Sequence, residues 1–313
     1  MKKTIYKASS SNIKKAVNIL NRSGIVGFPT ETVYGLGGSA ESESSIKKIY
    51  EIKNRPLHNP LIIHVAKLEQ AKKIGIFNNI AKKLAEAFWP GPLTLLVEKK
   101  KNNRIVSAAT SNLESMAIRI PSNPIALEIL NIFGKPIAAP SANLSGTVSS
   151  TNAMHVLNDF GDKIDLIIDN GDCEYGIEST IIDVRSNKVK ILREGSITKE
   201  NIFDCLNQNI EDYNDSKIIS PGQLDKHYAP KAIIRMNIEE PEKDEFYISF
   251  GYDLSSAQTI NLSKDSDLNE AAKKLYSTLR KIDDMGIKKV AVAPIPNIGI
   301  GRAINDRLAR ASK

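Results

Sequence analysis

Hydroxyl and carboxyl side chains follow the first apolar run of this sequence directly. Thr30, Glu31 and Thr32 come just after Ile25–Phe28, a run that is short and apolar enough to be a buried strand. Ligand sites of α/β proteins lie at the carboxyl ends of their strands. This position favours a binding role for the three side chains over a local role in a turn.

Two cations lie two residues apart on a loop after a predicted helix. Lys53 and Arg55 precede Pro56, which restricts the backbone there. A planar guanidinium and a compact ammonium can contact different oxygens of one polyphosphate. The residues alone leave open the alternative of a solvated basic loop.

Two polar residues lie inside apolar, strand-like runs. Arg119 lies in Met116–Ile120, and His64 lies in Leu61–Val65. A buried guanidinium without a partner is costly, so Arg119 needs an anion, either Glu31 or a bound carboxylate. His64 is either a satisfied core residue or a ligand contact.

Glycine-rich segments give weaker signals. Gly35–Ala40 matches a loose dinucleotide-binding pattern, but residues 30–34 separate it from the strand and no ribose-binding acid follows at the usual distance. The sequence has no Walker-type Gly-Lys-Ser/Thr, HExxH or GxSxG motif. The commonest plans for NTPases, metalloproteases and serine hydrolases therefore lack support.

The elements that must position these residues follow from hydrophobic periodicity. The predicted strands are Ile25–Phe28, Leu61–Val65, Leu93–Val97, Met116–Ile120, Pro136–Ala139 and Leu166–Asp169. The predicted helices are Asn12–Asn21, Ser44–Ile52, Ile80–Phe88, Pro124–Ile132 and Asn152–Phe160. Strands that alternate with helices indicate an α/β domain, and a predicted hairpin of Thr180–Val184 with Lys188–Leu192 makes its sheet mixed.

A polar segment separates this part of the chain from a second α/β pattern. The segment Asn207–Ser220 has little apolar periodicity, and Pro221-Gly222 and His227–Pro230 follow it. Predicted strands Phe246–Phe250 and Val290–Pro294 flank a helix with one apolar face, and a last helix starts near Arg302. A small Rossmann-like domain fits this pattern, and a length of 313 residues fits two domains.

Charge is distributed unevenly over a globular composition. Apolar residues make up 41% of the chain, and residues 1–140 carry a net charge of +12 against −5 for the remainder. Such a surplus attracts polyanions, although a solubilising surface would have the same composition. The two cysteines, Cys173 and Cys205, support neither a disulfide framework nor a zinc site. With no signal peptide or long apolar run, we expect a cytoplasmic protein with no membrane contact.

Several motifs that recur in order carry a more specific signal. The stretches FPTETVYGLGG, KNRPLHNPLIIHV, WPGPLTLL, AIRIPSNP, APSANLSG, GIESTIIDV and ILREGSI resemble the YrdC-type domain of the threonylcarbamoyl-AMP synthase family. The resemblance covers about residues 4–205. The tail motifs SPGQLDKHYAP and APIPNIGIGRAINDRLARA resemble the linker and C-terminal domain of the two-domain members.

This resemblance implies a fold and three parts of the chain. The fold is α/β, a YrdC-type twisted, mixed open sheet with helices, followed by a linker and a small Rossmann-like α/β domain. The implied parts are a catalytic domain over residues 1–206, a linker that serves as an active-site lid over 207–231, and a C-terminal domain over 232–313. Gln223-Leu224-Asp225 departs from some relatives, so lid contacts before His227 match the family less closely.

The resemblance also implies a reaction and its residues. The family forms L-threonylcarbamoyladenylate and pyrophosphate from L-threonine, bicarbonate and ATP, for threonylcarbamoyladenosine modification of tRNA. Threonine would contact Thr32, His64, Arg119, Ala139 and Ser179. ATP would contact Lys53, Arg55, Asn59, Ser115, Ser141, Asn143, Ser149, Arg193 and Tyr228. Lys53, Arg55 and Arg193 would stabilise the phosphate charge as catalytic residues, together with Mg²⁺ that no protein side chain is expected to bind.

Two other functions compete with this interpretation. A basic α/β surface could be an RNA-binding module without catalysis, although the sequence lacks an RNP-like stacking motif. A carbamoyl-transferring or hydrolysing relative would share the core but lack the SPG…HYAP linker and the last domain. The expected partners of the enzyme are its three substrates, the downstream threonylcarbamoyl transferase machinery and tRNA.

Overall fold

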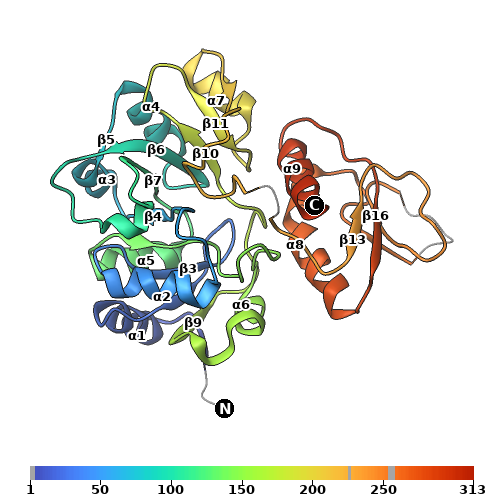
Figure 1. Ribbon diagram of the computed structural model, residues 1–313, viewed down its shortest axis with the longest axis horizontal. Helices are drawn as coiled ribbons and strands as arrows, with labels where there is room; N and C mark the ends of the chain where they lie inside the picture. The colour runs from blue at the N-terminus through green and yellow to red at the C-terminus, as the bar shows by residue number, and fades with distance from the viewer. Residues whose placement is uncertain (1–3, 225–226, 253–257) are drawn as a thin grey trace.

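The computed structural model describes residues 4–224, 227–252 and 258–313, so positions 225 and 226 of the expected linker lie outside the described residues. The chain forms a larger α/β domain and a smaller one, which lie side by side (Figure 1). This arrangement confirms the predicted α/β fold with a mixed sheet and a second, smaller sheet.

The larger sheet has the order β1-β9-β2-β3-β8-β4-β7-β6-β10-β11-β12, and β5 pairs with β6. Its parallel and antiparallel pairs alternate irregularly: β4 runs parallel to β7, whereas β2 and β3 are antiparallel, as are β10 and β11 of the predicted hairpin. The strands are β1 (Ile5–Lys7), β2 (Val26–Phe28), β3 (Gly35–Ser39), β4 (Ile62–His64), β5 (Gly75–Ile76), β6 (Leu93–Lys99), β7 (Ser115–Arg119), β8 (Ile137–Ala138), β9 (Leu166–Asp169), β10 (Thr180–Asp183), β11 (Lys190–Arg193) and β12 (Glu211–Asp212).

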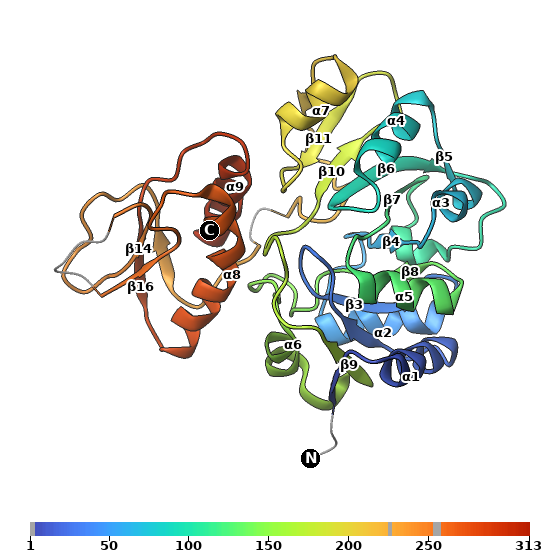
Figure 2. The ribbon, with the colours of Figure 1, turned by 180° about the vertical axis from the view of Figure 1, so that it is seen from behind.

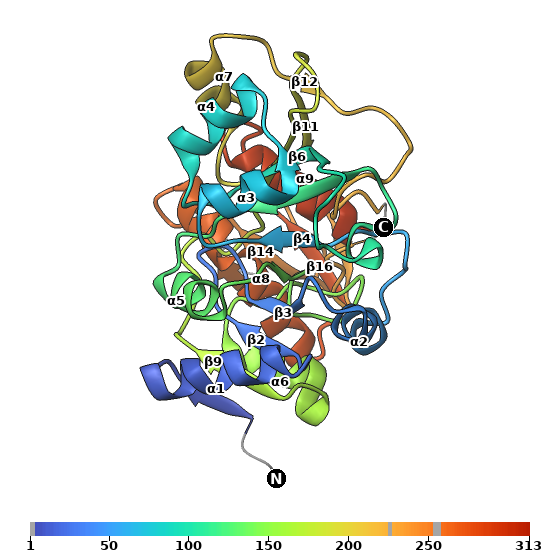
Figure 3. The same ribbon diagram turned by 90° about the vertical axis from the view of Figure 1, so that its left-hand side faces the viewer.

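Helices cover both faces of this sheet. In Figure 3, α2 and α5 lie on opposite sides of β3. The apolar core is correspondingly divided, since Ile46 and Ile49 of α2 pack in one cluster and Ile129 of α5 packs in another. The helices of this domain are α1 (Ser10–Asn21), α2 (Glu43–Lys53), α3 (Leu68–Ile74), α4 (Asn79–Phe88), α5 (Pro124–Phe133), α6 (Ala153–Phe160) and α7 (Lys199–Leu206), with single 3₁₀ turns at Ser107–Thr110 and Gly161–Lys163.

Local sequence explains where these helices begin and end. Helix α5 starts after Asn123, whose side chain accepts hydrogen bonds from the backbone N–H groups of Ile125 and Ala126, with Pro124 in the first turn. It ends at Gly134, whose φ of 69° lies in the left-handed region that glycine adopts without strain. Both ends of α5 are therefore defined by local sequence.

The smaller domain has a parallel four-stranded sheet in the order β13-β16-β14-β15. Its helices α8 and α9 lie between this sheet and the larger domain, as Figures 1 and 2 both show. The elements are β13 (Ile233–Arg235), β14 (Phe246–Ser249), β15 (Thr259–Asn261), α8 (Leu268–Asp284), β16 (Lys289–Val292) and α9 (Gly301–Ala311). Among the described residues, no helix is both long and apolar enough to cross a membrane.

Candidate functional site

A pocket lies where β2, β4, β7 and β8 end. The parallel register of β4 and β7 places His64 beside Arg119, and β8 runs antiparallel to β4 so that Ala138 lies beside Ile63. Residues of the larger domain and of the linker line the pocket together. They include Thr30, Thr32, Tyr34, Arg55, His64, Arg119, Ala139, Ser141, Glu178, Ser179, Arg193, Gly222, His227 and Tyr228.

Arg119 at the end of β7 is paired and still has donors to spare. Its guanidinium contacts Glu31 Oε1 at 2.7 Å and donates to Thr32 Oγ1 at 2.8 Å and to the Gly91 carbonyl at 3.2 Å. Burial raises the pKa of Glu31, but Arg119 outweighs this effect and the net pKa is lowered. A guanidinium has five N–H groups, so these bonds leave two for a ligand. The buried arginine therefore has Glu31 as its partner and can also bind a carboxylate.

His64 at the end of β4 is a neutral imidazole that faces the pocket. Burial, followed by the charge of Arg119, lowers its pKa to about 3. Nδ1 lies 3.2 Å from the Ile62 carbonyl, which can only accept, so Nδ1 carries the proton. The other ring nitrogen, Nε2, is then an acceptor for a donor in the pocket.

Three buried cations lie near Arg119 and His64, in the pocket wall or behind it. Lys53 ends α2 and donates from Nζ to the carbonyls of Ser141, at 2.7 Å, and Asn143. Burial lowers the pKa of Lys53 well below its usual value, and the charge of Arg55 lowers it further. Arg193 ends β11 and donates to the carbonyl and hydroxyl oxygens of Ser179. Lys53, Arg55 and Arg193 form no ion pair with any described acidic residue.

Arg55 is held by the loop that follows it. It donates to the Asn59 carbonyl at 2.9 Å, to Asn59 Oδ1 at 2.6 Å and to the Pro60 carbonyl at 2.7 Å. Burial lowers its pKa to about 10. Uncompensated charge in a desolvated position is costly, so this arrangement favours a polyanionic ligand over a solvated basic loop.

Glu178 joins the pocket to the smaller domain, a role that the sequence did not reveal. Ser149 donates its hydroxyl to Oε1, while Tyr276 of α8 and Arg307 of α9 donate to Oε2 at 2.8 Å and 3.0 Å. Burial raises the pKa of Glu178, but the charges of Arg307 and Arg193 outweigh it and lower the pKa to about 2. The carboxylate therefore stays ionised in a wholly buried position.

The linker places His227 and Tyr228 over the pocket. Tyr228 has a φ of 61°, a conformation that costs a tyrosine roughly 1–2 kcal/mol. Its ring stacks on Tyr276 at 5.7 Å, and the guanidinium of Arg307 lies 5.1 Å from the ring centre. The Tyr228 hydroxyl and His227 Nδ1 are buried and have no hydrogen-bond partner among the described residues. Backbone strain together with unpaired polar atoms is typical of a ligand contact.

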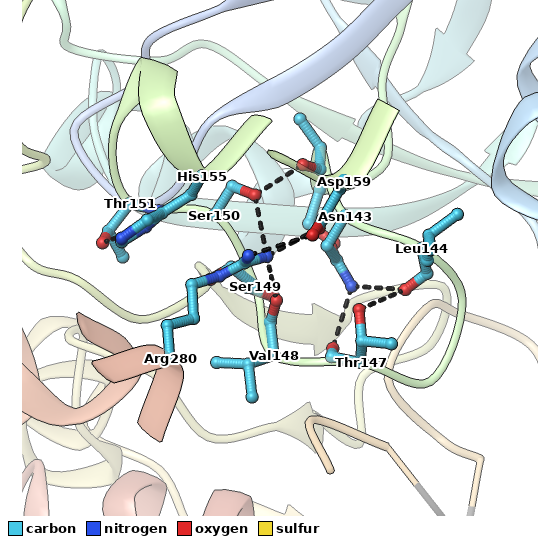
Figure 4. Close-up of polar contacts among 12 residues, drawn as sticks. Asn143, Leu144, Thr147, Val148, Ser149, Ser150, Thr151, His155, Asp159 and Arg280 are labelled. Atoms are coloured by element: carbon cyan, nitrogen blue, oxygen red, sulfur yellow. Dashed lines mark hydrogen bonds and ion pairs between the residues drawn. The ribbon is translucent and has the colours of Figure 1, made fainter. Parts of the chain in front are cut away.

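Most of the predicted site residues line this pocket, but five do not. Lys53 and Asn59 lie behind the wall and contact Ser141 and Arg55 as described, and Ser115 lies at the far end of β7 from Arg119, opposite Glu98 of β6. Asn143 and Ser149 lie on the loop after β8, where the Asn143 amide bonds to the Leu144 and Thr147 carbonyls (Figure 4). Residues 143–151 form this loop, the 143–151 loop.

Comparison with known proteins matches two family models to successive parts of this chain. A family model described as telomere recombination matches residues 18–195, and a model described as the C-terminal domain of threonylcarbamoyl-AMP synthase matches residues 197–313. Threonylcarbamoyl-AMP synthase of Bacillus subtilis is 36% identical over 322 residues, which cover 96% of this chain and 92% of that protein. This chain belongs to the threonylcarbamoyl-AMP synthase family. Because both family models match, the chain has the catalytic part and the C-terminal part of the two-domain members.

Solved structures of a relative confirm the fold along the whole chain. Sua5 of Pyrococcus abyssi, complexed with L-threonine, superposes with a TM-score of 0.91 at 32% identity, covering 99% of this chain and 97% of that one. A variant of the same archaeal protein, with an adjacent histidine and tyrosine replaced by alanine, superposes with a TM-score of 0.89 at 32% identity, covering 98% of this chain and 96% of that one. In this sequence one histidine, His227, is followed by tyrosine. Membership of the threonylcarbamoyl-AMP synthase family supports the enzyme interpretation and not that of an RNA-binding module.

Proposed function

We propose that this protein joins L-threonine, bicarbonate and ATP to give L-threonylcarbamoyladenylate and pyrophosphate. The observation that carries the proposal is the charge arrangement of one pocket. A guanidinium with two free N–H groups, on Arg119, lies in the same pocket as Arg55 and Arg193, and neither of these two cations forms an ion pair with a described acidic residue. One amino-acid carboxylate at Arg119 and one polyphosphate at Arg55 and Arg193 would compensate these charges.

The threonine half would consist of the residues around Arg119. The two free N–H groups would bind the carboxylate in a bidentate fork. Neutral His64 would accept a hydrogen bond from the amine at Nε2, and Thr32 and Ser179 would supply hydroxyls. Ala139 has a side chain small enough to let the substrate approach the end of β8.

The nucleotide half would consist of the cations and the 143–151 loop. Arg55 and Arg193 would contact phosphate oxygens directly from the pocket wall, with Ser141 and Tyr228 beside them. Lys53, Asn59, Ser115, Asn143 and Ser149 would act from behind the wall or after a local rearrangement. The described residues offer no group of three or more His, Cys, Asp or Glu side chains that could hold a metal ion. We therefore expect Mg²⁺ to enter as MgATP, held by the phosphates of the substrate.

The reaction needs no nucleophile from the protein. The threonine amine would take up bicarbonate, with loss of water, to form a carbamate, and a carbamate oxygen would attack the α-phosphorus as pyrophosphate leaves. Arg55, Arg193 and Lys53 would stabilise the charge that develops on the phosphates. Carbamates are short-lived in water, so the buried position of His227 and Tyr228 over the pocket has a chemical reason.

We place the reaction in tRNA modification. The adenylate would pass its threonylcarbamoyl group to a downstream transferase that modifies tRNA to threonylcarbamoyladenosine, in the cytoplasm. The reactive mixed anhydride also favours a short transfer to that partner.

Pyrophosphate release tests the proposal. We expect release from MgATP only when threonine and bicarbonate are both present, with the adenylate detected by mass spectrometry. In Arg119→Lys the charge toward Glu31 remains but the fork is lost, so the KM for threonine should rise about 10–100-fold while ATP binding changes little. Release without threonine, or an unchanged threonine KM in this variant, would contradict the assignment.

A further inference from the structure

One arginine of the smaller domain reaches across to the 143–151 loop. Arg280 of α8 donates from Nε to the Ser149 carbonyl at 3.2 Å and from one terminal nitrogen to the Val148 carbonyl at 2.6 Å (Figure 4). The same nitrogen lies 3.1 Å from Ser150 Oγ. A bidentate ion pair with Asp159 of α6, at 2.7 and 3.0 Å, fixes the plane of the guanidinium.

The loop that Arg280 holds contains no helix or strand, and backbone N–H groups of other segments bond to its Gly146, Ser150 and Thr151 carbonyls. No other described residue donates to the Val148 or Ser149 carbonyl, and both residues are buried. From the opposite side Lys53 holds the start of the same segment, because its Nζ bonds to the Ser141 and Asn143 carbonyls. The loop therefore lies between an inner anchor behind the pocket wall, Lys53, and an outer anchor in the smaller domain, Arg280.

The outer anchor also acts on the charge of the inner one. Asp159 raises the pKa of Lys53, whereas Arg280 lowers it, after the larger effects of burial and Arg55. Without Arg280, the Asp159 carboxylate would lose its partner in a position from which it acts on Lys53. This one side chain of α8 therefore acts both on the carbonyls of Val148 and Ser149 and on the charge of Lys53.

We propose that Arg280 is a positioning residue for ATP, through which the C-terminal domain completes the nucleotide half of the pocket. This inference rests on the proposed function, since it takes the 143–151 loop and Lys53 as ATP contacts. Arg280 does not touch the pocket itself. It acts by fixing the backbone of Val148 and Ser149, and with it the Ser149 hydroxyl that donates to Glu178.

The alternative is that Arg280 only attaches one domain to the other. In that case any interdomain arginine would serve equally well. Arg302 of α9 offers the matched control, because it pairs across the same domain boundary with Glu194 at 3.5 Å and Glu200 at 2.5 Å but does not touch the loop.

The test compares four variants of the full chain: Arg280→Met, Arg280→Lys, Asp159→Asn and Arg302→Met. Binding of a non-hydrolysable ATP analogue and of threonine is measured by titration calorimetry, and pyrophosphate release gives the two KM values. We expect Arg280→Met to weaken binding of the ATP analogue at least about tenfold and threonine binding less than about twofold. Arg280→Lys should restore part of the loss, since one ammonium keeps the charge toward Asp159 but cannot reach both carbonyls.

Asp159→Asn keeps the bonds to both carbonyls, so it should weaken ATP binding less than Arg280→Met. If Arg280→Met does not fold, Arg280→Lys decides the matter, because it should weaken binding of the ATP analogue more than binding of threonine. Arg302→Met should leave both affinities within about twofold. Unchanged ATP affinity in Arg280→Met, an equal loss for both ligands, or an equal ATP effect in Arg302→Met would overturn the proposal. Failure of the proposed function would be a different result, because the unaltered protein would then bind neither ligand.

Discussion

Replacing Arg307 with methionine should destabilise the protein more than any surface change, because it leaves a buried carboxylate without its charge partner. Arg307 is fully buried and lies 3.0 Å from Glu178 Oε2 through Nε. It also donates to the Glu194 carbonyl at 2.8 Å. Methionine keeps much of the side-chain volume, so lost charge rather than a cavity dominates the effect.

The contacts set the size of the effect. Breaking a buried ion pair by removing one partner costs about 3–5 kcal/mol of unfolding free energy. Tyr276 and Ser149 still donate to Glu178 in this variant, which places the estimate near the lower end, about 3 kcal/mol. The Glu194 carbonyl would lose a donor at a further cost of about 1 kcal/mol. We therefore expect a total of about 4 kcal/mol at pH 7.

The measurement is urea unfolding of the unaltered chain, Arg307→Met, Glu178→Gln and the double variant. The double variant removes both charges, so it should recover at least about half of the loss in Arg307→Met. The loss should also shrink as the pH falls below the ordinary Glu pKa of 4.5. The charge of Arg307 is the largest of the effects that lower the pKa of Glu178 to about 2, so without it the pKa is less depressed and acidification removes less of the stability of the variant than of the unaltered protein.

Two results would refute this reasoning. A loss below about 1 kcal/mol in Arg307→Met would mean that the ion pair contributes no more than a surface pair. If the double variant loses as much unfolding free energy as Arg307→Met and Glu178→Gln lose together, the charges of Arg307 and Glu178 do not interact.

Three further predictions concern the pocket and its lid. Lys53→Met should abolish pyrophosphate release without lowering the melting temperature, since a buried ammonium is costly. The control, Lys47→Met on the exposed side of the same helix, should leave release unchanged. Retained activity in Lys53→Met would contradict the nucleotide assignment. Deletion of residues 221–313 should lower activity at least about 100-fold, because it removes Tyr228 and the helices that hold it, and full activity of the shortened chain would show that the lid is dispensable. The pKa of His64 is about 3 in the folded protein against an ordinary 6.5. As the pH falls toward 5.5, only the unfolded state takes up this proton, and the unfolding free energy should therefore be about 1.4 kcal/mol lower at pH 5.5 than at pH 8. In His64→Gln this part of the acid sensitivity should vanish, and identical pH profiles for the two proteins would contradict the assigned pKa.

Hydrophobic periodicity predicted those strands and helices whose sequences have a regular apolar pattern. The predicted strands Leu93–Val97 and Leu166–Asp169 appear as β6 and β9, and the predicted helices appear within one or two residues of their ends. Periodicity does not predict strand β3, because three of its five residues are glycine and the strand therefore has no alternating pattern of side chains. A Cβ at Gly37 would lie 2.6 Å from the Phe28 ring, so the glycines there allow close packing in the sheet and do not form a dinucleotide loop.

Partners that are distant in sequence were the harder part of the site. The composition of its strand showed that Arg119 needs an anion and left Glu31, 88 positions away, and a bound carboxylate as alternatives, and the structure shows that Glu31 is a partner. Glu178 was visible only as a polar residue before a strand, and its partners Tyr276 and Arg307 lie on helices that look like ordinary amphipathic surfaces of another domain. Burial of an ion pair depends on how two domains meet, which no local pattern contains.

The contacts of Tyr228 argue that the proposed lid and the C-terminal domain are one unit. Tyr228 is buried in the same apolar cluster as Tyr276 and the strands of the smaller sheet. The backbone of the lid is tied to α9 as well, because the His227 N–H donates to the Arg310 carbonyl and Arg310 donates to the Leu224 carbonyl at 2.7 Å. A loop that moved alone would have to break these bonds and expose Tyr228 to water. If the linker opens the pocket as we propose, the smaller domain would move with it, and this motion would also take Arg307 from Glu178 and Arg280 from the 143–151 loop.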